Sequence, residues 1–389
     1  MEINVNIRRL ILVIISLMIY FCAMMSVSYA LYHANHDNDD VYEKNGAKHD
    51  EIYFVHDIYG ERFSEKIESL NLSDIIVDDK ITGYVKLFPN LKSVNFGSQI
   101  LDDEIITNLI NNNSNIEFEY KVEIANKVFT SLTSHLDLSN NKHIDFDTLV
   151  SKMKLLPNLK TADFSNCNLS NEQLGNLREL FPNIDINWVV HLGKWSVKTD
   201  AVSFSVLIYH FDYVRMTSKD IEVLKYCTKL QALDLGHQAI TDVSVIGEYL
   251  PNLRILILAD NKVSDITPLK NLKHLHYLEL FINPIKDITP LEGLTELVDV
   301  NFCYCWGIKD YSTLNSLPNL ERIWLVGTKI NQKGVDALKE VHPDAIIINT
   351  GAGSTNSGWR THERYFEMIK MYRNPYYLSE SFTKYDNIK

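Results

Sequence analysis

Apolar residues recur at a fixed spacing in the C-terminal half of the chain. From Leu253 the sequence reads LRILILADNKVSDITPL, and from Leu275, 22 residues later, it reads LHYLELFINPIKDITPL, with apolar residues and an asparagine at the same positions. Further copies begin at Leu230, Leu297 and Leu320. This spacing indicates stacked repeats, because one copy alone cannot bury its own apolar face.

The same rhythm is present earlier in the chain, in a looser form. The copies IESLNLSDIIV, LKSVNFGSQIL, HLDLSNNKHI and LKTADFSNCNL begin at Ile67, Leu91, His135 and Leu159. Their second halves, such as EQLGNLRELFP, have the apolar spacing of a helix. The weakest copy lies around Ile116 to Tyr120.

The pattern L-x-x-L-x-L predicts a short strand with its leucines on one face, toward the core. Strands of successive copies then pair in parallel, and the rest of each copy returns outside the sheet as a helix or turns. We therefore expect an α/β solenoid, a leucine-rich-repeat horseshoe in two arrays, with a parallel concave sheet and short helices or turns on the convex side.

Two similar stretches, Leu169–Ile186 and Ile330–Ile348, predict where the two arrays end: each has a helical segment, a proline and a short apolar strand. Between the arrays the chain has no repeat but alternates enough to predict a strand pair that couples them. The predicted organisation is a signal or anchor (1–30), a polar spacer and N-terminal cap (31–64), the first array (65–188), a β-rich connector (189–216), the second array (217–349) and a linker with an aromatic tail (350–389).

The N-terminus has the charge order of a targeting segment. Arg8 and Arg9 precede the uncharged run 10–27, and Ala30 precedes a polar, acidic stretch. This arrangement predicts a signal peptide cleaved near Ala30, or an uncleaved membrane anchor. In both cases the positive charges stay inside and the repeats lie outside the membrane. We expect contact with a membrane only through residues 10–27.

The C-terminal tail changes in composition after Asn349. Residues 350–358 (TGAGSTNSG) resemble a flexible linker, and the run from Trp359 to Tyr372 is aromatic and predicts a short amphipathic helix. Two roles are open for this helix: a cap over the last repeat, or a docking segment.

The D-I-x-P-L copies between Leu230 and Ile330 resemble the internalin-like leucine-rich repeats of bacterial surface proteins. The wider chain, over roughly residues 65–370, resembles leucine-rich-repeat surface proteins of Gram-positive gut bacteria through the pieces HLGKW (191–195), KTD (198–200), YCTKLQALDLGH (226–237) and GW-R-x-H-x-R-YF (358–366). The resemblance implies a repeat fold and a binding role at a cell surface. The chain departs from cell-wall-anchored proteins because it has no L-P-x-T-G sorting motif.

Polar residues that follow the strands are candidates for a structural ladder. A buried amide at this position can bond turn backbone groups that would otherwise lack partners. Asn261 and Asn283 occupy it in the best-matched copies, and the set comprises Asn141, Gln238, Asn261, Asn283 and Thr328.

The concave face of the second array is the candidate binding site. Residues between the strand leucines point away from the core, and several are aromatic or charged, as in many binding hot spots. The candidates are Ile257, Tyr277, Glu279, Phe281, Asp299, Arg322 and Trp324. The alternative is that the tail or an adjoining segment covers these residues. The equivalent residues of the first array are smaller and more polar: Ser93, Asn95, Gly97, Thr161, Asp163 and Ser165.

Charge and composition limit the classes of function that are possible for this chain. A formal net charge of −12 argues against a nucleic-acid partner. Neither a H-E-x-x-H zinc motif nor a G-x-S-x-G, phosphate-loop or dinucleotide motif is present, so we expect no catalytic residues, no metal and no cofactor. Four cysteines follow the leader without a C-x-x-C pair, and we expect buried or free thiols at Cys167, Cys227, Cys303 and Cys305.

The sequence therefore favours an extracytoplasmic binding protein that recognises a protein or glycan through its concave face. The alternative is a secreted or surface enzyme with its site at the connector, where His191, Trp195, Asp200, His210 and His237 lie near one another in the sequence. No spacing among these residues selects a mechanism.

Overall fold

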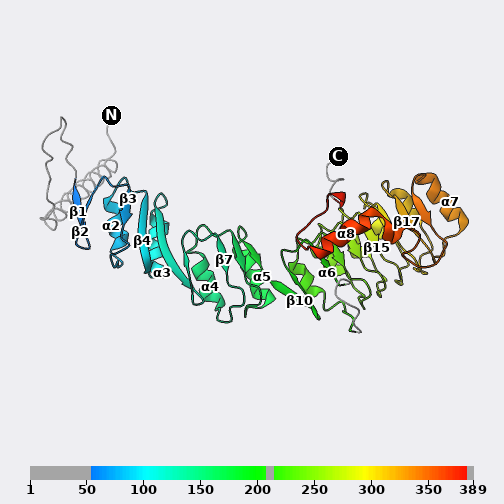
Figure 1. The fold of residues 1–389 in the computed structure, drawn as a ribbon, viewed down its shortest axis with the longest axis horizontal. Helices are drawn as coiled ribbons and strands as arrows, with labels where there is room; N and C mark the ends of the chain where they lie inside the picture. Colours follow the sequence, from blue (N-terminus) through cyan, green and yellow to red (C-terminus); the bar gives the residue numbers. More distant parts are fainter. Residues whose placement is uncertain (1–53, 207–213, 383–389) are drawn as a thin grey trace, which may run out of the picture. The chain divides into compact units, whose positions relative to one another are not determined.

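A computed structural model describes residues 54–206 and 214–382 of the 389-residue chain (Figure 1). The chain forms two compact units: the first contains the residues up to Thr133 together with Ser151–Asn158, and the second contains Ser134–Val150 and everything from Leu159 on. The predicted signal segment and anchor lie outside the described residues. Within the described ranges, no helix combines the length and the apolar character needed to cross a membrane.

The first unit begins with an antiparallel hairpin, β1 (Val55–Ile58) and β2 (Glu61–Ser64). A four-stranded sheet follows, in the order β3 (Ser69–Asn71), β4 (Ser93–Ile100), β5 (Glu117–Ile124) and β6 (Lys127–Thr130). The helical segments α2 (Ile81–Tyr84), η1 (Val85–Leu87) and α3 (Asp103–Asn112) return the chain between the strands. β3, β4 and β5 are parallel, whereas β6 turns back antiparallel to β5, so the run of parallel strands ends here.

The second unit contains a three-stranded parallel sheet of β7 (His135–Asp137), β8 (Thr161–Asp163) and β9 (Asp185–Asn187). α4 (Phe146–Met153), of which residues 151–153 are assigned to the first unit, follows β7, and α5 (Asn171–Leu180) follows β8. A capping box starts α5, since the Ser170 side chain accepts from the Gln173 N–H and the Gln173 side chain bonds the Ser170 backbone. The sequence predicts a single first array over residues 65–188, but its strands belong to two separate sheets.

The connector after β9 contains the expected strand pair, an antiparallel hairpin of β10 (Val189–Leu192) and β11 (Trp195–Lys198). The last part of the connector also forms a strand that the sequence does not predict. β12 (Ser203–Ser205) pairs in parallel with the first strand of the second array, and Phe204 and Val206 are buried. The connector therefore contains one further repeat strand. The leucine pattern does not predict this strand, because serines stand at two of its three positions.

The second array forms a seven-stranded parallel sheet that begins with β12. The other strands are β13 (Ala232–Asp234), β14 (Ile255–Ile257), β15 (Tyr277–Glu279), β16 (Asp299–Asn301), β17 (Arg322–Trp324) and β18 (Ile346–Ile348). The middle residue of each strand from β13 to β17 is completely buried, as the repeat leucines predict. The returns are η3 (Glu222–Tyr226), α6 (Ser244–Tyr249), η4 (Thr267–Asn271), η5 (Thr289–Leu291), η6 (Ser312–Ser316) and α7 (Gln332–Val341).

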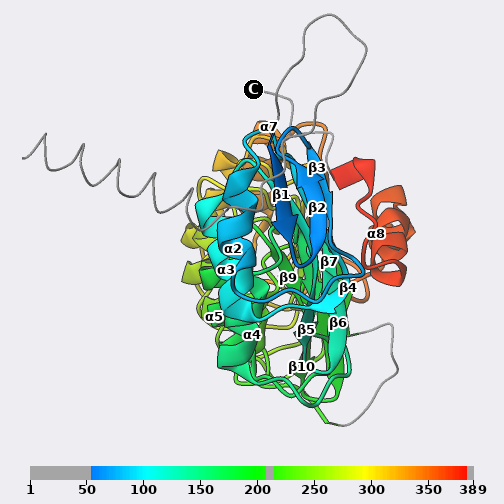
Figure 2. The ribbon, with the colours of Figure 1, turned by 90° about the vertical axis from the view of Figure 1, so that its left-hand side faces the viewer.

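The C-terminal segment, residues 350–382, packs against this sheet. It contains η7 (Trp359–Thr361), α8 (Glu363–Arg373) and η8 (Glu380–Phe382). Figure 2 shows α8 on the side of the strands opposite α5. Buried residues of the segment, including Trp359 and Met371, form one apolar cluster with outward-facing residues of the sheet. The tail helix therefore covers the face of the sheet that the sequence predicts to be the concave binding face.

Candidate functional site

The seven predicted binding residues come together on the sheet face that the C-terminal segment covers, and they are not exposed. Their exposed fractions lie between 0 and 3%, for Ile257, Tyr277, Glu279, Phe281, Asp299, Arg322 and Trp324. The expectation of an open aromatic patch is therefore wrong, because the C-terminal segment lies on these side chains. Their role in binding a ligand stays a prediction.

Asp299 is the centre of a buried ion-pair network. Arg322 of β17 binds both carboxylate oxygens, with Nε and Nη2 at 2.8 and 2.6 Å. Arg364 of α8 binds the same two oxygens at 2.9 and 2.8 Å, and its remaining nitrogen pairs with Glu321 at 2.6 Å. Two planar guanidinium groups thus satisfy one carboxylate, and one of them comes from the C-terminal segment.

Glu279 is the second anchor for the C-terminal segment. Its carboxylate accepts from Trp359 Nε1 at 2.8 Å, from Arg360 Nη2 at 2.9 Å and from the Tyr277 hydroxyl. Burial, and then the neighbouring Glu279 charge, raise the pKa of Tyr277 well above its ordinary value. Tyr277 is therefore a neutral hydrogen-bond donor and not a candidate base.

Trp359 fills the apolar part of the face. Its ring lies 5.3 Å from the Tyr277 ring and 5.1 Å from the Trp324 ring, and the Arg322 guanidinium stacks on it at 4.6 Å. The Trp324 indole N–H donates to the Asn356 carbonyl at 3.0 Å. The charged and aromatic side chains of this face thus contact the C-terminal segment of the same chain. These residues do not form an open binding surface.

The polar residues after the strands bond the turn backbone. Asn261 accepts from Ile240 N–H at 3.0 Å and donates to Leu235 and Leu258 carbonyls at 2.9 and 3.1 Å. Asn283 makes the equivalent bonds one repeat later. Gln238 also bonds a preceding repeat, since it accepts from the Met216 N–H at 2.9 Å, whereas Thr328 and Asn141 make short-range bonds, to the Leu325 carbonyl and from the His143 N–H. Asn168 and Gln99, which the sequence does not single out, accept from the Ile144 and Val77 N–H groups of the preceding repeats.

Cys305 occupies the ladder position one repeat after Asn283. Its thiol donates to the Leu280 carbonyl at 3.2 Å, so a cysteine partly replaces the asparagine amide there. Burial raises the pKa of Cys305 to about 12, and the thiol therefore stays protonated. The four described cysteines are free thiols, and three of them are buried.

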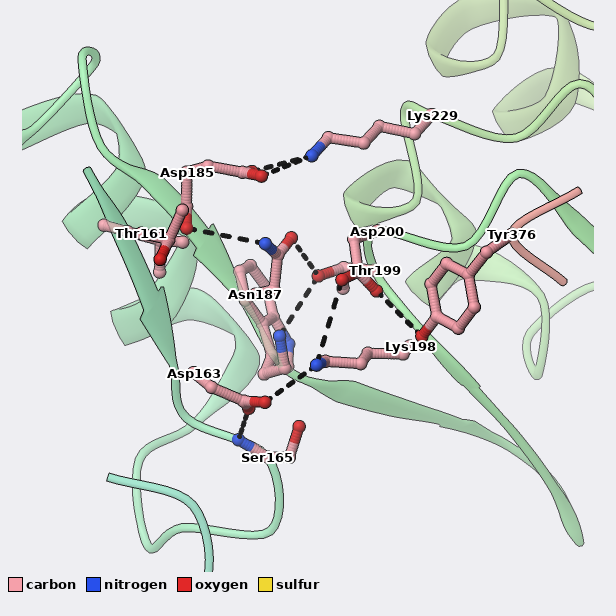
Figure 3. A network of polar contacts seen from close by, with 12 residues as sticks. Thr161, Asp163, Ser165, Asp185, Asn187, Lys198, Thr199, Asp200, Lys229 and Tyr376 are labelled. Atoms are coloured by element: carbon pink, nitrogen blue, oxygen red, sulfur yellow. Dashed lines mark hydrogen bonds and ion pairs between the residues drawn. The ribbon is translucent and has the colours of Figure 1, made fainter. Parts of the chain in front are cut away.

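Polar contacts connect the three-stranded sheet of the second unit to the β10–β11 hairpin and to the start of the seven-stranded array (Figure 3). Lys198 of β11 binds Asp163 of β8 at 2.7 Å. Partial burial raises the pKa of Asp163, but hydrogen bonds from Lys198 and Ser165 outweigh it and leave the pKa below its ordinary value. Lys229 binds both oxygens of Asp185 at 2.7 Å.

Asp200 and His237, two residues of the enzyme alternative, bond different side chains. Asp200 accepts from the Tyr376 hydroxyl at 3.3 Å, whereas His237 pairs with Asp260 at 3.0 Å. His191 is exposed on β10, Trp195 is buried, and His210 lies outside the described residues. The described residues also contain no group of three or more His, Cys, Asp or Glu side chains that could hold a metal ion.

An open pocket of about 560 Å³ lies instead in the first unit, beside β5. Its size is within the range of ligand sites. Its lining residues include Ser69, Ser93, Asn95, Asn113, Ser114, Ile116, Glu117, Phe118, Glu119, Tyr120, Leu132 and Asn158. The sequence pattern does not single out Glu117 and Glu119, although the poor match of residues 116–120 to the repeat indicates that the array is interrupted there.

These features define a leucine-rich-repeat solenoid: short parallel strands in register, buried leucines and polar residues bonding the turns. A family model described as "Leucine Rich repeats (2 copies)" matches residues 251–293, which span β14 and β15. No curated protein matches the chain.

Solved structures with some similarity include leucine-rich-repeat proteins of two bacteria. Internalin C2 of Listeria monocytogenes is 22% identical, with a TM-score of 0.31, and the match covers 56% of this chain and 80% of that one. The internalin InlF of the same organism is 18% identical, with a TM-score of 0.33, covering 75% and 86%. A leucine-rich-repeat protein of Leptospira interrogans is 19% identical, with a TM-score of 0.28, covering 56% and 60%.

Proposed function

We propose that this protein is a non-catalytic, extracytoplasmic binding protein that recognises a protein partner through its first unit. The observation that carries this proposal is the 560 Å³ pocket beside β5, which combines polar side chains with a strand edge and apolar walls. Convergent polar groups in a mostly preformed hollow are typical of binding sites.

The concave face of the second array is a weaker candidate because the chain occupies it. A ligand could reach Tyr277 or Trp324 only after Trp359 and the helix α8 had left. That departure would break the pairs of Arg360 with Glu279 and of Arg364 with Asp299, and it would expose buried aromatic rings. We therefore assign the C-terminal segment a structural role.

The extracytoplasmic location rests on the charge order around residues 10–27. Protease added to intact cells should digest the repeats while a cytoplasmic marker survives. Protection of the repeats in cells whose surface proteins are digested would contradict the proposed location.

The binding site can be tested by photo-crosslinking in the full chain. A benzoylphenylalanine placed at Leu132, which lines the pocket and is 62% exposed, should capture a protein from surface extracts. The matched control is Phe366 on α8, which is 53% exposed but lies outside the pocket. Equal capture from both positions, or capture from Phe366 alone, would refute the assignment of the site to the first unit. Capture of glycan and not protein at Leu132 would refute the proposed class of partner.

A further inference from the structure

The edge of β5 is paired along only half of its length. Residues 121–124 pair with β6 on the side away from β4. On that same side, no strand in the described part of the chain pairs with residues 117–119. Tyr120 closes the paired half, because its carbonyl accepts from Ser131 N–H at 2.9 Å. The pocket lies along the remaining stretch, where the next repeat of a regular array would place a strand.

The register with β4 determines which backbone groups face this edge. Glu117 aligns with Ser93, Glu119 aligns with Asn95, and the Glu117 N–H donates to the Lys92 carbonyl. In a parallel ladder the N–H and C=O of one residue point to the same side, and successive residues alternate. Glu117 and Glu119 therefore bond toward β4, and the N–H and C=O of Phe118 point into the pocket.

The charge of the pocket is acidic. The Glu117 and Glu119 side chains are exposed on one face of β5, two residues apart, while Phe118 points to the core. No lysine or arginine lines the pocket, and nearby Lys92 already pairs with Glu68 at 2.7 Å. Ile116 and Leu132 supply apolar walls along which the stem of a long basic side chain can lie.

We propose that the pocket binds an extended peptide with lysine or arginine at alternate positions, which adds as a strand along residues 117–119. This inference rests on the proposed function and specifies the chemistry of the partner. The backbone of Phe118 supplies the main-chain hydrogen bonds, as in other cases of strand addition. The alternating basic side chains lie on the face of Glu117 and Glu119, because directly opposed residues are about 5 Å apart across a strand pair.

The first test uses labelled peptides and the full chain. Fluorescein-labelled Lys-Val-Lys-Val-Lys should bind, measured by anisotropy at low salt, and Glu-Val-Glu-Val-Glu should not. Two further peptides carry backbone N-methyl groups either on the lysines or on the valines. Only one of these sets can face β5, so one methylated peptide should lose binding and the other should keep it. Equal affinities of the two methylated peptides, or equal binding of the acidic peptide, would overturn the proposal.

The second test changes the carboxylates. Glu117→Gln and Glu119→Gln should each weaken binding of the lysine peptide about 2- to 5-fold, as expected for exposed ion pairs, and the double variant about tenfold. The matched control is Glu123→Gln, because Glu123 is exposed on the same face of β5 but lies beyond the pocket, opposite Val128 of β6. Equal losses in all three variants would overturn the proposal.

The two proposals fail separately. If the crosslinker at Leu132 captures a protein but the lysine peptide does not bind, the strand-addition inference falls and the binding function stands. A neutral oligosaccharide that competes with the peptide for the pocket would also overturn the inference. Neither strand pairing nor charge pairing would explain binding of the oligosaccharide at this site.

Discussion

Asp299→Asn tests whether the C-terminal segment is part of the folded second unit. The substitution keeps the shape of the side chain but removes its charge and replaces one acceptor with a donor. Arg322, whose side chain is 2% exposed, would keep one neutral amide oxygen in place of two carboxylate oxygens, together with the Trp359 carbonyl at 3.2 Å. Removing one partner of a buried pair costs about 3–5 kcal/mol, since the other charge stays buried without compensation. We expect a loss of that size.

The matched control is Glu321→Gln, which also removes a carboxylate from Arg364. The Glu321 side chain is 51% exposed, so the pair is screened by water and should contribute about 0–1 kcal/mol. Both variants remove one negatively charged partner of Arg364. The difference between their losses of stability therefore reports the effect of burial and not of charge alone.

Urea denaturation followed by tryptophan fluorescence measures this contrast. All five tryptophans, Trp188, Trp195, Trp306, Trp324 and Trp359, lie in the second unit, so the signal reports on that unit. Proteolysis within residues 350–358 gives a second readout, since a loosened C-terminal segment should be cut faster in Asp299→Asn. Losses below about 1 kcal/mol in Asp299→Asn, with unchanged proteolysis, would refute the docked arrangement.

Three other predictions concern the same unit. Asn261→Ala and Asn283→Ala should each cost about 1–3 kcal/mol, because turn groups lose their buried partners, and unchanged urea midpoints would contradict the ladder. Trp324→Ala should cost about 3–5 kcal/mol as a core aromatic, and a loss near zero would mean that the face is open in solution. Burial raises the pKa of Asp234 to about 6, so the folded state favours the protonated acid. The stability of the wild type relative to Asp234→Asn should therefore fall by up to about 3 kcal/mol as pH rises from about 4 to 6, and parallel pH profiles would refute this.

The repeat pattern was sufficient to locate the strands of the second array. The leucine alternation is local, and β13 to β17 each have the middle residue that it turns inward. The pattern does not predict β12, because it depends on leucines and this strand consists of Ser203, Phe204 and Ser205. The pattern also does not predict that the first run of parallel strands ends at β5, although the copy at residues 116–120 matches the repeat poorly.

The sequence by itself determined the repeats, their strand positions and the side of each strand that faces the core, because these follow from short-range periodicity. Only the tertiary structure decided which outward faces stay open. Trp359 meets Glu279 across 80 residues of chain, and no local pattern specifies where a linker of glycines and serines will deliver a helix. Docking of that segment buries the most aromatic face of the second array. In the first unit, a pocket lined by small polar side chains such as Ser93 and Asn95 stays open. Burial is a property of contacts between distant segments, and so the site with the stronger sequence signal became the covered one.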